Sequence, residues 1–110
     1  MKVLRLKKNA GFKTVFGKGA YYADSRLVLY VLRNGKDANY FGVSVGKKIG
    51  GSVARNRVKR LIREAIRLHA ARVAAGHDII VLARPQAAGE TLAGIERSLS
   101  RLLARSKIYL

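Results

Sequence analysis

The fold of this chain is decided by residues 50–67, which read GGSVARNRVKRLIREAIR. The glycine pair and Ser52 are typical of a turn that leads into a helix N-cap. At 100° per residue, the positions that follow divide into an apolar arc, which can pack against a sheet, and a cationic arc. The apolar arc contains Val58, Leu61, Ile62, Ala65 and Ile66. The opposite arc contains Asn56, Lys59, Arg60, Arg63 and Arg67, with Arg55 and Arg57 beside them at the first turn.

The charge balance of the chain indicates a polyanionic partner. Its 110 residues carry 23 Lys and Arg against six Asp and Glu, which gives a net charge of +17 and a pI near 11.2. Charge of this density repels itself in the compact state unless a polyanion neutralises it. Nucleic acid, an anionic membrane surface and an acidic protein are the alternatives. Nucleic acid is favoured, because the cations lie inside the folded pattern and not in a detachable tail.

Composition also excludes several classes of site. The chain has no cysteine, so disulfides, zinc–thiolate sites and thiol chemistry are excluded. The longest apolar run, residues 27–32, is too short to span a bilayer. A secretory signal needs an uninterrupted apolar segment, whereas charged residues separate the leucines at the N-terminus. We therefore expect a cytoplasmic protein with no membrane partner, folded as a single domain over residues 1–110.

Local patterns predict three helices and three strands. Residues 1–8 are a basic lead-in, extended or mobile, and Asn9 is placed to cap a helix over residues 10–17. Buried strands are expected over residues 25–33 and 40–45, joined across the turn at residues 34–37 as an antiparallel hairpin. The basic helix should run over residues 52–75 until Gly76, followed by a central strand over residues 78–83 that ends before Pro85. Leucines at helical spacing from Leu92 to Leu103 predict a final amphipathic helix, and thus an α+β sandwich.

Signatures of catalysis by the protein itself are weak. His69 and His77 have no acidic neighbours placed to complete a metal site, and the six acids are scattered singly, so we expect no catalytic and no metal-ligating residues. Residues 46–52 resemble a phosphate-binding loop but lack the Lys-Ser/Thr that follows the second glycine. This loop is either a tight turn or a place where the backbone approaches an RNA phosphate.

Three aromatic residues have two interpretations. Phe12 and Phe16 share one face of the first expected helix, and Tyr30 lies in the middle of a strand. They are either ordinary core residues or, as a group beside cations, a surface on which unpaired bases stack.

The segment Arg55-Asn56-Arg57-Val58-Lys59-Arg60-Leu61-Ile62-Arg63-Glu64 resembles the signature helix of the bacterial ribonuclease P protein component family. Residues 6–19, with their two phenylalanines, resemble that family's first helix, and residues 27–30 and 42–50 resemble its strands and the lead into the signature helix. The resemblance implies the family's fold. It is a ribosomal protein S5 domain 2-like α+β sandwich in the order αβββαβα, with about four strands, three helices and an unusual left-handed βαβ crossover.

The resemblance also implies a function. The chain would be the accessory protein of a ribonucleoprotein endonuclease that removes the 5′ leader of precursor tRNA, with the chemistry in the RNA subunit and Mg²⁺ held mainly through that RNA. The partners would be one RNA subunit per protein monomer and precursor tRNA, with no small-molecule substrate. Contact with the RNA subunit is implied for Lys47, Lys48, Arg55, Asn56, Arg57, Lys59, Arg60 and Arg63. Contact with the leader is implied for Phe12, Phe16, Tyr30 and Arg84.

Two alternatives remain at this point. A general RNA-binding protein of the ribosomal kind would have the same charge and no catalytic partner, and would not prefer ribonuclease P RNA over ribosomal RNA. A protein nuclease acting alone would cleave without added RNA. A helix-turn-helix DNA-binding protein fits less well, because the long basic helix is bracketed by strands.

Overall fold

The computed structural model describes residues 3–110, and its elements follow the expected αβββαβα order after one additional short strand. The strands are β1 (Leu4–Arg5), β2 (Ala20–Ala23), β3 (Leu27–Arg33), β4 (Tyr40–Val45) and β5 (His77–Ala83). The helices are α1 (Ala10–Lys18), α2 (Ser52–His69) and α3 (Leu92–Arg105), with the 3-10 turns η1 (Lys47–Ile49), η2 (Ala70–Arg72) and η3 (Pro85–Gly89). The implied fold class is confirmed, with a fifth strand at the edge of the sheet.

The five strands form one sheet in the order β1-β4-β5-β3-β2. β5 is central because Ile79, Ile80 and Val81 are fully buried and require cover on both faces. It pairs antiparallel with β3 and parallel with β4. The predicted β3–β4 hairpin is therefore wrong, since β5 lies between those strands, and the true hairpin joins β2 to β3.

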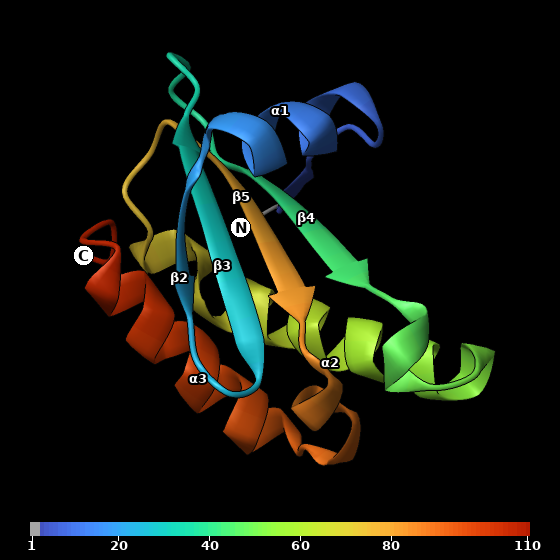
Figure 1. Cartoon of the computed structure of the whole chain (residues 1–110). Coiled ribbons are helices and arrows are strands. Elements are labelled where there is room, and N and C mark those ends of the chain that lie inside the picture. The colour runs from blue at the N-terminus through green and yellow to red at the C-terminus, as the bar shows by residue number, and fades with distance from the viewer. Residues whose placement is uncertain (1–2) are drawn as a thin grey trace.

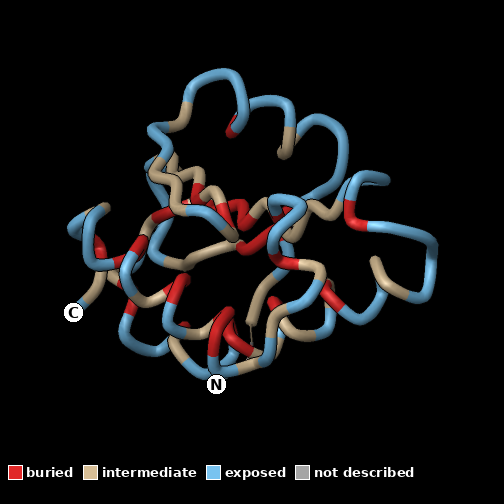
Figure 2. The backbone as a smooth tube through the Cα atoms, turned by 60° about the horizontal axis from the view of Figure 1, so that its bottom comes forward, coloured by how far each residue is buried: buried red, intermediate tan, exposed pale blue. Residues whose placement is uncertain are grey.

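Helices cover both faces of the sheet unequally. The fully buried Leu27, Leu29, Ile79 and Val81 point toward α2 and α3 and form the main core with them, whereas Ile80 packs with Val15 of α1 on the opposite face. Figure 2 shows the buried backbone gathered in the interior, with exposed stretches outside it. In Figure 1, β5 lies to the left of β4, both point downward and α2 passes behind them. The β4–α2–β5 crossover is thus left-handed, as the resemblance implied.

The basic helix is shorter than its sequence pattern predicted. α2 ends at His69 and passes into η2, whereas the prediction extended it to residue 75. The chain leaves the helix axis there because Ala70 and Val73 are buried, and Val73 bridges to Tyr109 in the C-terminal segment. Gly76 therefore does not end the helix. Its φ of 96°, in the left-handed region that glycine tolerates, serves the turn into β5.

The N-terminal predictions hold in part. Residues 1–2 of the expected lead-in lie outside the described residues, and Leu4–Arg5 pairs in parallel with Tyr40 and Phe41 at the sheet edge. α1 begins at Ala10 as predicted, but Asn9 makes no side-chain capping bond. Its φ of 62° and ψ of −95° differ from the extended backbone of a capping residue, so only its backbone carbonyl takes part, accepting from Lys13.

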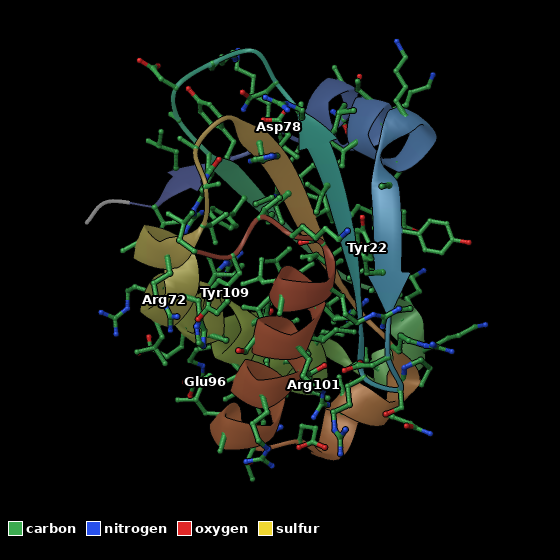
Figure 3. All side chains as sticks on the ribbon, turned by 90° about the vertical axis from the view of Figure 1, so that its left-hand side faces the viewer. Tyr22, Arg72, Asp78, Glu96, Arg101 and Tyr109 are labelled. Atoms are coloured by element: carbon green, nitrogen blue, oxygen red, sulfur yellow. The ribbon has the colours of Figure 1, made fainter. Side chains whose placement is uncertain are left out.

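The turn between β2 and β3 is tied to α3 by Asp24. One carboxylate oxygen accepts from the amides of Arg26 at 2.8 Å and Leu27 at 2.9 Å, and the other accepts from the Ser98 hydroxyl and from Arg101. Figure 3 shows Arg101 on α3, the helix that faces this end of the sheet. Burial alone would raise the pKa of Asp24, but the bond from Ser98 and the two amide bonds outweigh it, so the pKa lies below 3.8.

This bonding predicts a pH-dependent contribution to stability. A carboxyl group with a lowered pKa in the folded protein stabilises the fold above its unfolded pKa, and loses that contribution as the pH falls through its folded pKa. We expect Asp24→Asn to lower the free energy of unfolding by about 2 kcal/mol near pH 7 and by almost nothing at about pH 2. Urea titrations across this range measure the difference, with Asp37→Asn in the exposed β3–β4 loop as the control. An equal penalty at both pH values would contradict this role.

Candidate nucleic-acid interface

The two arcs of α2 are arranged as the sequence predicted. Val58, Ile62, Ala65 and Ile66 are buried and Leu61 is half-buried, so the apolar arc faces the core. The opposite face is hollowed, with a cavity of about 410 Å³. It is lined by Asn56, Lys59, Arg60, Arg63, Glu64 and Arg67. Glu64 is the single acid in this set, so the surface is strongly positive.

The cationic side chains of α2 differ in whether they are already bonded within the protein. Arg57 donates to the carbonyls of Ala88 at 3.3 Å and Glu90 at 2.7 Å, which braces η3 against α2. Arg67 pairs with Glu64 three residues earlier. Across residues 3–110, Lys59, Arg60 and Arg63 take part in no ion pair or side-chain hydrogen bond. These three side chains, like that of Arg55 at the first turn, are therefore free to meet phosphates, while Arg57 has a structural role that its position in the motif did not indicate.

The segment before α2 combines a required glycine with exposed cations. Gly50 has a φ of 142°, which side chains rarely adopt, and Gly51 is the N-cap of α2 in place of the predicted Ser52. No side-chain hydrogen bond caps this helix end, and its first turn holds no acid, so both features favour an anion there. The φ of Gly50 gives the tight strand-to-helix turn, and this turn leaves the amides at the start of α2 open to an anion.

Lys47, Lys48 and Arg84 meet at the carboxyl ends of β4 and β5. They line one cavity of about 380 Å³. Arg84 is oriented by a 2.9 Å bond to the Asp24 carbonyl and lies beside the two lysines, away from the phenylalanines with which the family resemblance had grouped it. The structure thus places Lys47 and Lys48, predicted to contact the RNA subunit, beside Arg84, predicted to contact the leader.

The aromatic residues form a partly exposed cluster on the α1 face of the sheet. The Phe16 ring lies edge-on to Tyr30, with centroids 4.8 Å apart, and 38% of Phe16 is exposed. Tyr21 lies 5.8 Å from Tyr30 and is 68% exposed. Sequence reasoning missed Tyr21 because it missed β2, although the two adjacent tyrosines at positions 21 and 22 are typical of a short strand. Tyr22 points the other way, toward α3 (Figure 3).

Phe12 is placed differently from the other aromatic residues. Its ring lies 6.1 Å from Phe16, but it also covers Gly42, where an added Cβ would approach the ring to 2.4 Å. Phe12 is therefore a half-buried packing residue between α1 and β4. Its remaining exposed surface faces a cavity at the edge of the sheet.

An uncovered strip of sheet connects the aromatic cluster to the Lys47–Arg84 cavity. Val28 lies two residues before Tyr30 on the same face, and its partner in β5 is Leu82, which in turn is opposite Ser44. These three residues are half-buried and line the cavity with Lys47, Lys48 and Arg84. The result is a continuous surface, aromatic at one end and cationic at the other.

The two histidines have packing roles. His69 bonds the Tyr109 hydroxyl through Nδ1 and places Nε2 3.4 Å from the Glu96 carboxylate, next to the stacked Arg72 and Tyr109 side chains (Figure 3). His77 is buried and bonds the Ala74 carbonyl. Over residues 3–110 no three His, Asp or Glu side chains gather as a metal-binding group, and no helix is long and apolar enough to cross a membrane.

Comparison with known proteins gives this arrangement a family. The sequence model of the family described as Ribonuclease P matches residues 1–107. The chain belongs to the ribonuclease P protein family. It is 42% identical to the ribonuclease P protein component of Clostridium kluyveri, with 99% of both chains covered. Two solved ribonuclease P proteins share the fold. The one from Staphylococcus aureus has a TM-score of 0.88 at 39% identity, covering 99% of this chain and all of that one. The one from Thermotoga maritima has a TM-score of 0.81 at 28% identity, covering 96% and 97%.

Proposed function

We propose that this chain is the protein subunit of a bacterial ribonuclease P ribonucleoprotein and binds the RNA subunit through α2. The observation that carries the proposal is the outer face of α2. The buried apolar arc fixes the helix against the core, so that Lys59, Arg60 and Arg63 face outward. These three side chains make no ion pair within residues 3–110. Arg55 and Asn56 extend this face toward the N-terminus of the helix, where Lys47 and Lys48 lie. The full-length likeness to ribonuclease P protein components supports that RNA as the polyanion.

The single-stranded 5′ leader of precursor tRNA is the second partner in this proposal. Single strands are held by aromatic faces on which bases stack and by cations that follow the backbone. The strip from Phe16, Tyr21 and Tyr30 to Arg84 offers both in that order along one face of the sheet. Mature tRNA has no leader, so this surface favours substrate over product.

In this proposal the hydrolysis occurs on the RNA subunit, with one protein monomer per RNA and Mg²⁺ held mainly through the RNA. The metal supplies an activated water and charge stabilisation at the phosphodiester. The protein acts by electrostatics and position. Its net charge of +17 lowers the repulsion between two RNAs, so less Mg²⁺ is needed for assembly and docking.

Reconstituted cleavage tests this function. Precursor tRNA is incubated at limiting Mg²⁺ with a bacterial ribonuclease P RNA, with this protein, and with both. We expect cleavage at the mature 5′ end to be stimulated only in the complete mixture. Cleavage by the protein alone would place the chemistry in the protein, and a folded protein that gives no stimulation would favour the general RNA-binding alternative.

A further inference from the structure

The edge of the sheet beside β1 contains a cavity that shares only Arg63 and Arg67 with the cationic face of α2. It measures about 270 Å³ and lies between the N-terminal segment, α1, β4 and α2. Its apolar lining is Val3, Leu6, Phe12, Phe41, Val43 and Ile66. Its cationic lining is Arg5, Lys8, Arg63 and Arg67, and no acid lines it. The volume is just below the range of pockets that hold small ligands, so it fits one compact planar group.

The backbone adds hydrogen-bonding groups to this cavity. β1 pairs with β4 only at Tyr40 and Phe41, and the Leu6 amide donates to the Phe41 carbonyl at 2.9 Å. Residues two apart on a strand direct their N–H and C=O groups to the same side. Val43 therefore directs both groups outward, at the point where β1 has already turned away. An unpaired strand edge of this kind offers a donor and an acceptor side by side.

We propose that this cavity binds one unpaired nucleotide of the ribonuclease P RNA subunit, a proposal that rests on the proposed function. The base enters the apolar interior against Phe12 and Phe41, and its polar edge meets the backbone of Val43. The phosphate lies on the rim at Lys8 and Arg63, two cations that make no ion pair within residues 3–110.

The RNA subunit is favoured as the source of this nucleotide because the cavity continues the surface of α2. Arg63 and Arg67 line both this cavity and the hollow on the cationic face of α2. The aromatic cluster proposed for the leader is separated from the cavity by Phe12, which fills the space over Gly42. A nucleotide bulged from an RNA that lies along α2 reaches the cavity directly.

Two variants test the site in the complete protein. Val3→Trp fills the cavity from the residue just before β1, near the chain terminus where substitutions are tolerated, with Leu110→Trp at the opposite terminus as the matched control. Lys8→Gln removes a rim charge, with the exposed neighbour Lys7→Gln as its control. We expect Val3→Trp to weaken binding to the RNA subunit about tenfold and Lys8→Gln to lower the salt dependence of binding by about one counterion, with smaller effects from both controls. Thermal unfolding establishes that each variant is folded.

Chemical probing of the RNA subunit identifies the bound base. One unpaired base should be protected by the wild-type protein and by Leu110→Trp, and become reactive again with Val3→Trp. Wild-type affinity and unchanged protection with Val3→Trp would overturn the proposal. The proposal would also be overturned if Val3→Trp weakened binding only to a single-stranded leader oligonucleotide. The same holds if the wild-type protein self-associates and Val3→Trp abolishes that self-association. If the wild-type protein does not bind the RNA subunit at all, both this proposal and the proposed function fail. The cleavage assay tests the proposed function independently of the cavity.

Discussion

Replacing Arg60 and Arg63 by glutamine is expected to weaken binding to the RNA subunit by one to two orders of magnitude while leaving the fold intact. Both side chains are exposed on α2 and make no ion pair or side-chain hydrogen bond within residues 3–110, so their removal takes nothing from the packing of the protein. Each cation that neutralises a phosphate releases a counterion, so the slope of log affinity against log salt should fall by about two.

The control for this pair has to remove the same charge elsewhere. Arg97→Gln/Lys107→Gln does so on exposed positions of α3 and the C-terminal segment, neither of which lines the hollow on α2. Binding titrations at several salt concentrations then separate a local contact from a general effect of net charge. Equal losses for both pairs would mean that the RNA senses only the total charge of +17, and that α2 is not a specific interface.

The sequence predicts α2 well because its signal is local and long. Eighteen residues with one apolar and one cationic arc fix both the helix and the direction in which its charges point. The C-terminal boundary was wrong because it depends on a distant event, the docking of Tyr109 against Val73. The alanines that follow His69 give no local signal against continuing the helix.

Strand pairing could not be read from local patterns. The turn at residues 34–37 suggests a hairpin, but β5 is inserted between β3 and β4 because its apolar residues gain more by central burial. The resemblance supplied the extra strand of the αβββαβα chain order and the left-handed crossover, which periodicity alone could not. The residue-based prediction lacked β2 and therefore also missed Tyr21 as a site residue. The β2–β3 register pairs Tyr21 with Tyr30, and only this pairing brings the exposed ring to the aromatic cluster.

That register makes the aromatic cluster testable. Phe16→Ala/Tyr21→Ala is expected to weaken binding of precursor tRNA to the holoenzyme by about 10- to 100-fold, since a stacked base contributes about 1–3 kcal/mol. Affinity for mature tRNA and for the RNA subunit should remain near wild type, because neither involves the leader. Measuring precursors with long and single-nucleotide leaders side by side isolates the effect, which should be absent for the shorter substrate.

Conservative variants distinguish stacking from packing. Tyr21→Phe keeps the ring and removes only the hydroxyl, so it should bind precursor as the wild type does. Phe16→Leu keeps apolar bulk next to Tyr30 but removes the aromatic face, so it should lose most of what Phe16→Ala loses. If Phe16→Leu binds precursor normally, the ring serves only to pack α1 against the sheet. The leader would then be held by Lys47, Lys48 and Arg84 at the other end of the strip. Its affinity would come from phosphate contacts alone and would fall steeply with salt concentration.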